Sequence, residues 1–489
     1  MHIVDLIIFF LFTGGIVLFG FSFFRRKTSS EEFTSAGRSL PGWVVGMSIF
    51  ATYISSISYL GYPSKAYASN WNAFVFCLSI PIASFFAAKY FVPFYRKQCS
   101  VSAYNFLEER FGKWARLYAS ACYLLTQIAR MGSILYLLAL PMNVLMGWDI
   151  KIVIVVTSLA IIAYAIAGGM KAVVWTEAVQ GIVLIGGALA CLFTLLFSMP
   201  EGPLQTWNIA ISDAKLSLGS FDITDWSTST FWVCLIYGIF INLQNYGIDQ
   251  NYVQRYHTAT SDHEARKAAL FGGYLAIPVS LLFFMIGTAL YAYYKVQPEL
   301  LPANGIKDDY VFPYFIVNQM PTGLTGLLIA SIFAAGMSTV ATSVTSASTI
   351  VLTDYYKTFR KKASNREEMI VLKAASAVVG MLGIIVALAL VNVDSILDAW
   401  WKLSSIFSGG MLGLFLLGFT CQHVKSIHAA IAVIFGFLVI AWISADTWLG
   451  LPESGIHEYM AIVLGTATIF IGGFLLAMPL GILKKNKAH

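Results

Sequence analysis

The chain has 489 residues, of which 58% are hydrophobic and only 11% are charged. Soluble domains carry charge on about a quarter of their residues, so this composition excludes a soluble globular protein and indicates an integral membrane protein. The net charge of +6 does not indicate a nucleic-acid partner, because it comes from basic loops that gather on one side of a bilayer.

Thirteen apolar segments are long enough to cross a bilayer. No basic leader precedes the first, so it is interpreted as a retained span and not as a signal peptide. An odd number of spans places the two termini on opposite sides of the membrane. The predicted spans cover residues 4–24, 43–69, 72–95, 117–147, 150–169, 174–198, 229–254, 268–294, 322–354, 370–392, 395–421, 426–446 and 457–482.

The loops fix the orientation of these spans. Counting span ends, one set of loops holds 23 Lys and Arg residues and the other set holds 4. Basic residues stay in the cytoplasm, so we expect the N-terminus outside and the C-terminus inside. The longest external loop, about residues 199–228, is expected to form a short cap. No soluble domain is apparent, and residues 1–489 are interpreted as a single membrane transport domain.

The second span contains an unusual polar stretch. Residues 51–61 carry six hydroxyl side chains and end on Gly61. One or two hydroxyls in a membrane helix are explained by bonds to the helix's own carbonyls. Six in eleven residues favour a locally unwound helix, whose freed carbonyls and hydroxyls hold an ion.

The seventh span contains a second polar cluster, Asn242–Gly247, followed by Asp249, Gln250 and Asn251. Two interrupted spans, five apart, are typical of transporters built from two inverted repeats with a binding site at the midplane. The alternative is a tilted helix with a polar face toward its neighbours. A channel is compatible with the composition, but paired broken helices favour a carrier.

A third polar stretch, Ala334–Ser346, supplies hydroxyls at helical spacing: Ser338, Thr339 and Thr342. Together with opened carbonyls at Ala51 and Ile54, these oxygens suit a monovalent cation. No run of carboxylates favours Ca²⁺ or Mg²⁺. Neither paired catalytic carboxylates nor a metal-ligand spacing of the six cysteines is present, so we do not expect an enzyme.

The segment Gly168–Glu177 (GGMKAVVWTE) resembles a signature of the sodium:solute symporter family, as do Ser39–Trp43, Ala51–Gly61 and Asp249–Arg255. The resemblance implies an all-α, LeuT-like core of two inverted five-helix repeats, here 43–198 and 229–421. An extra N-terminal helix at 4–24 precedes the core and two C-terminal helices at 426–482 follow it. It also implies sodium-driven import through a monomeric transport unit. The family's sodium site falls on the carbonyls of Ala51, Ile54 and Ala335 and on the hydroxyls of Ser338 and Thr339.

Within the family, the chain is similar to bacterial sodium-coupled sialic acid symporters, which implies a bacterial inner membrane. Arg130 falls where those proteins hold the solute carboxylate. An arginine at membrane depth is costly, and its planar fork suits a carboxylate. The alternative is a structural ion pair with Glu177 or Asp249. The resemblance places Ser55 and Ser58 at the solute, with Tyr53 replacing a Thr and Cys77 replacing a Gln.

Other positions are expected to line the pathway or its outer gate: Asn242, Asn245, Tyr246 and Trp401. Lys402 is either a second cation facing the pathway or a snorkelling surface residue. A second sodium site of some sialic acid symporters falls on Ser338, Ala341, Thr342 and Glu177, where one hydroxyl is missing and the carboxylate is longer. The sodium–galactose symporters hold sugar through a Glu and a Lys, which fall on Cys77 and Ala276 here.

These observations predict a sodium-coupled symporter that imports a small organic anion by alternating access, with sialic acid or another acidic sugar as the first choice. The sodium count, one or two, is left open. The alternatives are a symporter for another solute, such as a monocarboxylate, uronate, vitamin, amino acid or neutral sugar, and a symporter-like sensor.

Overall fold

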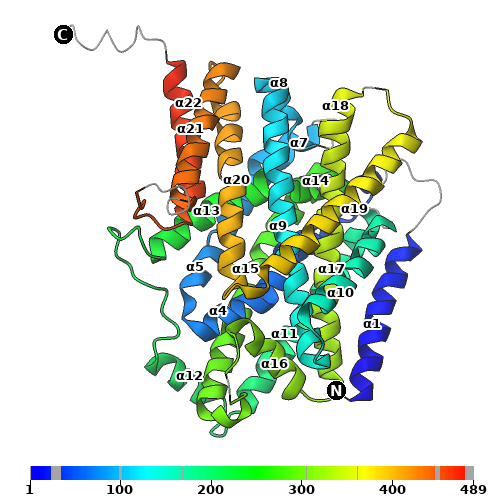
Figure 1. Ribbon diagram of the computed structural model, residues 1–489, viewed down its shortest axis with the longest axis vertical. Coiled ribbons are helices and arrows are strands. Elements are labelled where there is room, and N and C mark those ends of the chain that lie inside the picture. Colours follow the sequence, from blue (N-terminus) through cyan, green and yellow to red (C-terminus); the bar gives the residue numbers. More distant parts are fainter. Residues whose placement is uncertain are drawn as a thin grey trace.

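The computed structural model describes residues 2–23, 35–97, 102–167, 170–303, 305–360, 362–445 and 452–478. Within these ranges every regular element is helical, and one isolated bridge joins Leu40 to Ala259. The long helices form a bundle along the long axis, with α8 and α18 at its upper end and α12 and α16 at its lower end (Figure 1). Some of the 23 basic loop residues and part of the family signature lie outside the described residues: Arg25, Arg26, Lys27, Lys361, Lys484, Lys485 and Lys487, with Gly168 and Gly169.

Eleven helices in the described ranges are long and apolar enough to cross a membrane, and one further pair is bent at a break. A shorter apolar stretch lies at Ile150–Ile162. The predicted count of thirteen is therefore not confirmed and stays a prediction. The main helices are α1 (Ile3–Ser22), α3 (Gly42–Tyr53), α4 (Tyr62–Ala68), α9 (Lys113–Met146), α10 (Ile150–Ala167), α11 (Met170–Phe197), α13 (Phe231–Ile248), α15 (Asp262–Val296), α17 (Leu324–Ile350), α19 (Asn365–Ala389), α20 (Ile396–Thr420), α21 (Ser426–Ala445) and α22 (Met460–Ala477).

Shorter elements complete the chain. The third predicted span consists of several pieces rather than one regular helix. Helix α12 falls in the loop predicted to form a cap, whereas α16 was not predicted. The short elements are η1 (Ala36–Arg38), η2 (Ile57–Gly61), η3 (Trp71–Ala73), α5 (Phe74–Cys77), α6 (Ile80–Phe86), η4 (Ala87–Phe91), α7 (Val92–Lys97), α8 (Asn105–Phe111), α12 (Pro203–Ser212), α14 (Gln250–Thr258), η5 (Pro298–Leu300), α16 (Asp308–Asn318), η6 (Val351–Tyr356), α18 (Lys357–Phe359) and η7 (Leu390–Asn392).

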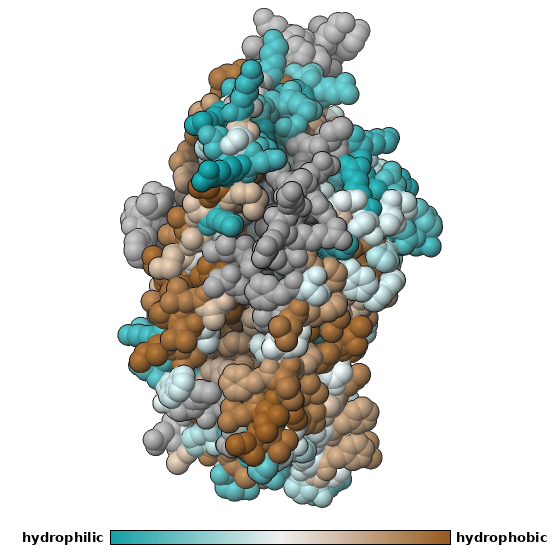
Figure 2. Space-filling view, turned by 90° about the vertical axis from the view of Figure 1, so that its right-hand side faces the viewer, coloured by the Kyte–Doolittle hydropathy of each residue, from teal (hydrophilic) through white to brown (hydrophobic). Residues whose placement is uncertain are grey.

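The outer surface of the bundle is apolar. Large side chains such as Phe10, Phe193, Ile434 and Phe437 are more than half exposed. Figure 2 shows apolar side chains across the middle and lower part of one face, with hydrophilic side chains gathered at the upper end. Such a band is stable only against lipid, because a soluble protein rarely exposes apolar area of this extent.

Helix α17 lies at the centre of the bundle and contacts α1, α9, α11 and α19. Its small residues let neighbouring helices approach closely. A Cβ added at Gly336 would clash with the Leu138 side chain of α9. Helix α3 packs against α11 and α15 in the same way, since a Cβ at Gly46 would lie 2.8 Å from Phe271. This close packing brings polar stretches distant in sequence into one core.

The extra N-terminal helix is tied to the start of α17. The carboxylate of Asp5, which is 3% exposed, accepts hydrogen bonds from the backbone amides of Gly323 (2.6 Å) and Gly326 (3.1 Å). These amides have no carbonyl partner within α17, and a carboxylate there also complements the positive end of the helix dipole. Asp5 therefore caps α17 from another helix.

The seventh predicted span is broken at a different residue than the sequence suggested. The polar cluster Asn242–Gly247 is helical and belongs to α13, which ends at Ile248. Asp249 then adopts an extended conformation (φ −73°, ψ 128°), and its side chain accepts from the Asn251 amide at 2.7 Å to begin α14. The break lies after the cluster because Asp is a strong N-cap, whereas Asn242 within the cluster donates from its side chain to the Ser79 hydroxyl at 2.8 Å and can stay in the helix.

Candidate functional site

The stretch from Ala51 to Gly61 is broken as predicted. Helix α3 ends at Tyr53, and Ile54 has extended backbone angles (φ −84°, ψ 93°). A π-helical turn, η2, then leads into α4, and the two halves of the span are bent by 52°. The last carbonyls of α3 lose their regular helical partners at this break. A side chain of the same stretch replaces one of these lost partners, because the Ser58 hydroxyl donates to the Tyr53 carbonyl at 3.3 Å.

The predicted sodium donors lie at this break and on α17, which contacts α3. Ile54, Ala335, Ser338 and Thr339 are buried, and Ala51 is partly buried. The Thr339 hydroxyl donates its proton to the Ala335 carbonyl at 2.9 Å, so its lone pairs remain available to a cation. The residues present therefore fit a monovalent cation, and the sodium assignment of each residue stays a prediction.

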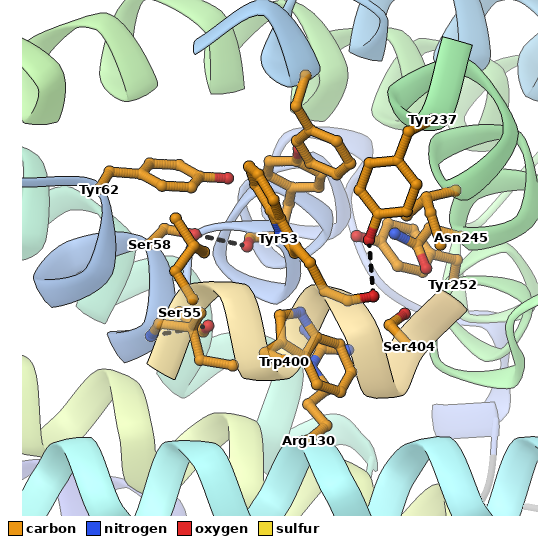
Figure 3. A pocket seen from close by; sticks show the side chains of 15 residues that line it. Tyr53, Ser55, Ser58, Tyr62, Arg130, Tyr237, Asn245, Tyr252, Trp400 and Ser404 are labelled. Atoms are coloured by element: carbon orange, nitrogen blue, oxygen red, sulfur yellow. Dashed lines mark hydrogen bonds between the residues drawn. The ribbon is translucent and has the colours of Figure 1, made fainter. Parts of the chain in front are cut away.

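A pocket of about 530 Å³ of empty space, counted with its mouth, opens beside the break (Figure 3). Six of the predicted solute or gate residues line it: Tyr53, Ser55, Ser58, Arg130, Asn245 and Trp401. They come from the broken helix, α9, α13 and α20, which the chain brings together from four distant segments. A concave site with apolar walls and a few convergent polar groups is the usual form of a small-molecule binding site.

Among the described residues, Arg130 is the only charged side chain that lines this pocket. It lies on α9, is 9% exposed, and donates from Nη2 to the carbonyl of Thr52 at the end of α3. No described carboxylate oxygen lies within 4 Å of it. The structural ion pair considered for Arg130 is thus not formed with either candidate partner. A guanidinium has five N–H donors, so most remain available to a bound anion.

Asp249 and Glu177, the two candidate partners of Arg130, are occupied elsewhere. Asp249 caps α14 and lies 3.4 Å from the Gln127 amide. Glu177 forms an ion pair with Arg255 at 2.7 Å, and both side chains are completely buried.

Four predicted solute or gate residues do not line the pocket. Asn242 donates to the Ser79 hydroxyl at 2.8 Å, behind the wall. The Tyr246 ring lies 6.4 Å from the ring of Tyr53, and Cys77 is buried at the end of α5. Lys402 pairs with Glu458 at 2.5 Å on a partly exposed surface. Of the two alternatives for Lys402, this contact favours the surface residue.

Sequence reasoning missed several residues of the pocket wall: Ile57, Tyr62, Phe76, Tyr237, Ile241, Tyr252, Leu397, Trp400 and Ser404. Helical spacing contained a signal for some of them. Tyr62 follows Ser58 by four residues, and Ser404 follows Trp400 by four. Tyr237, Ile241 and Asn245 are likewise spaced by four on α13. Several aromatic rings in the wall pack together, with the Phe76 and Trp401 rings 4.7 Å apart.

Comparison with known proteins places this geometry in a family. The model of the sodium:solute symporter family matches residues 33–436. The sodium/sialic acid symporter SiaT of Proteus mirabilis is 33% identical over 94% of this chain and 93% of its own length. NanT of Aliivibrio fischeri, also a sodium/sialic acid symporter, is 31% identical over 96% and 92%. Sodium-coupled monocarboxylate transporter 2 of Danio rerio is 28% identical over 94% of this chain and 73% of its own length.

Solved structures give the same result. A substrate-bound, outward-open Na⁺-coupled sialic acid symporter, described as revealing a novel Na⁺ site, superposes with a TM-score of 0.89 at 30% identity. The match covers 97% of this chain and 98% of that one. A nucleobase-cation-symport-1 family transporter, at 13% identity and a TM-score of 0.58, shares the fold. The predicted all-α, LeuT-like class is thus confirmed, and the chain belongs to the sodium:solute symporter family of multi-pass, sodium-coupled membrane transporters.

Proposed function

We propose that this symporter imports a small organic anion together with sodium, and that the anion is sialic acid or another acidic sugar. The observation that carries the proposal is Arg130, a buried guanidinium in the pocket wall with no carboxylate within 4 Å among the described residues. A buried charge without a contacting counter-charge is unfavourable, so a bound anion is the natural partner of Arg130. The sialic acid named for two relatives is such an anion.

The remaining polar groups of the pocket suit the hydroxyls and amide of an acidic sugar. Ser55, Ser58, Asn245 and Ser404 all line it. The Tyr53 hydroxyl is buried and has no hydrogen-bond partner among the described residues. A buried polar atom without a partner destabilises the protein, and a ligand that forms a hydrogen bond with it removes this cost. The rings of Trp400 and Trp401 supply apolar walls for the carbon skeleton of the solute.

Sodium and solute would be coupled through the broken helix. Sodium bound by Ala51, Ile54, Ala335, Ser338 and Thr339 would hold the end of α3 against α17. The same break carries Tyr53, Ser55 and Ser58, so fixing it shapes the solute pocket. Alternating access would then separate α3 from α17 and release both ligands. We place the transport unit, a monomer, in a bacterial inner membrane with its N-terminus outside.

The test is uptake of labelled sialic acid by the purified protein in liposomes, with a sodium gradient or an equal potassium gradient. We expect uptake only with sodium, and a loss of at least about 30-fold in Arg130→Ala, because truncating one side of a buried charge pair costs about 2 kcal/mol or more. Arg130→Lys is the matched control, since it keeps the charge and loses the planar fork. Wild-type uptake that is equal in potassium would contradict the proposal.

A second candidate solute is a smaller carboxylate. Tyr53 stands where the resembling sialic acid symporters carry Thr, and its larger ring takes space in the pocket. The similarity to sodium-coupled monocarboxylate transporters agrees with this alternative. Competition in the same liposomes by monocarboxylates, uronates, vitamins, amino acids and neutral sugars separates the two candidates. Inhibition by a monocarboxylate without inhibition by sialic acid would favour the smaller anion.

A further inference from the structure

A buried cluster around Glu177 includes two positions, Glu177 and Thr342, to which the family resemblance assigns a second sodium site. Glu177 is on α11, Arg255 on α14 and Thr342 on α17, and a fourth member, Ser48, is on α3. All four side chains are at most 1% exposed. The cluster therefore ties together four helices that include both elements of the predicted sodium site.

Both carboxylate oxygens of Glu177 are fully engaged. Arg255 Nη2 donates to Oε1 and to Oε2, each at 2.7 Å. The Thr342 hydroxyl donates to Oε1 at 3.0 Å, and the Ser48 hydroxyl donates to Oε2. Two donors on each oxygen use the lone pairs that a cation would need.

Arg255 is itself held on several sides. Its Nε donates to the Ser48 hydroxyl at 2.8 Å, and its Nη1 donates to the Asn251 carbonyl at 2.7 Å. A sodium ion at Glu177 would therefore bring a second positive charge beside a fixed guanidinium in a dry interior. Like charges at that separation repel strongly where no water screens them.

Such a site would also have fewer oxygen ligands from side chains. Ala341 has no hydroxyl, and Thr342 points its hydroxyl proton at Glu177. Ser338 is predicted to serve the first sodium. The only carboxylate, Glu177, is already paired with Arg255, and few oxygens around it remain free. A hard cation such as sodium needs several oxygen ligands, so these residues do not form a site for it.

We infer that no second sodium binds at this cluster, because the longer carboxylate of Glu177 is fully engaged and Ala341 lacks the hydroxyl, so that this transporter couples one sodium to each solute. The inference rests on the proposed function for its solute. A single sodium moving with a monoanion carries no net charge, so the membrane potential does not drive accumulation. A second sodium would add one charge per cycle, and 100 mV would then raise accumulation about 40-fold.

Sodium binding without solute tests the inference directly. Tryptophan fluorescence of the purified protein is titrated with sodium at constant ionic strength, with choline as the replacement cation. We expect a Hill coefficient near one. Thr339→Val should raise the half-saturating sodium concentration at least about tenfold, because a charge-assisted ligand is lost. Thr342→Val, the matched variant one turn along α17, should change it less than about twofold.

A Hill coefficient approaching two, or an effect of Thr342→Val equal to that of Thr339→Val, would overturn the inference. In liposomes, sialic acid accumulation should not change when a potassium gradient with valinomycin sets the potential to −100 mV. An increase of about 40-fold would also overturn it. If no anion is taken up with sodium, the proposed function fails, and the fluorescence titration still decides the sodium count.

Discussion

Lys65 Nζ lies 2.6 Å from Asp398 Oδ2, and this ion pair joins α4, the second half of the broken helix, to the first turn of α20. The Tyr459 hydroxyl also donates to Asp398, at 2.8 Å. Leu397 and Trp401, on the same part of α20, line the pocket. The pair thus connects the broken helix, whose Ser55 and Ser58 line the pocket, with the wall that α20 contributes.

Neutralising this pair should slow transport without abolishing it. Both side chains are about one third exposed, so solvent screens their attraction. We expect Lys65→Met and Asp398→Asn each to reduce the initial uptake rate about two- to fivefold. The exchanged double variant, Lys65→Asp with Asp398→Lys, should recover part of the rate. A double variant no better than either single variant would show that the pairing itself does not matter.

The Glu177–Arg255 pair should contribute strongly to stability. Glu177→Gln leaves the completely buried Arg255 without its counter-charge, which costs about 3–5 kcal/mol. The apparent melting temperature in detergent should fall clearly. Lys402→Met is the control, because its pair with Glu458 is more than 40% exposed on both sides and contributes little. Equal melting temperatures for the two variants would contradict the structural importance of the buried pair.

Tyr53 should set solute preference. Tyr53→Phe removes the unpaired hydroxyl and keeps the ring, so we expect the KM for the preferred solute to rise about two- to tenfold. Tyr53→Thr enlarges the pocket and should shift selectivity toward larger acidic sugars. Competition uptake with sialic acid and a small monocarboxylate measures both effects. An unchanged selectivity ratio in Tyr53→Thr would remove Tyr53 from the specificity determinants.

Asp5 should stabilise α17 from the N-terminal helix. Asp5→Ala removes the acceptor for the Gly323 and Gly326 amides and should cost about 0.5–2 kcal/mol. Asp5→Asn keeps an acceptor oxygen and should lose much less. Melting temperatures of the two variants, with and without sodium, provide the measurement. If Asp5→Ala melts like the wild type, α1 is not needed to hold the start of α17.

The sequence by itself determined the all-helical membrane class, the position of the first broken helix and the family. Length and hydropathy are local properties, and the lipid environment leaves few alternatives to a helix. The hydroxyl-rich stretch ending at Gly61 predicted the break because it is also a local feature: so many polar side chains are unusual in a regular membrane helix. Six side chains of the pocket were also predicted, because their residue types and spacing, with the family resemblance, point to a solute anion.

Only the tertiary structure decided which buried charges pair. Four charged residues lie in apolar surroundings, and the sequence allowed more than one pairing among them: Arg130, Glu177, Asp249 and Arg255. The packing of α3, α11, α14 and α17 brings Glu177 and Arg255 into an ion pair, and Arg130 is left facing the pocket. A buried charge selects its partner by geometry within a few ångströms, and that geometry depends on helices far apart in the chain.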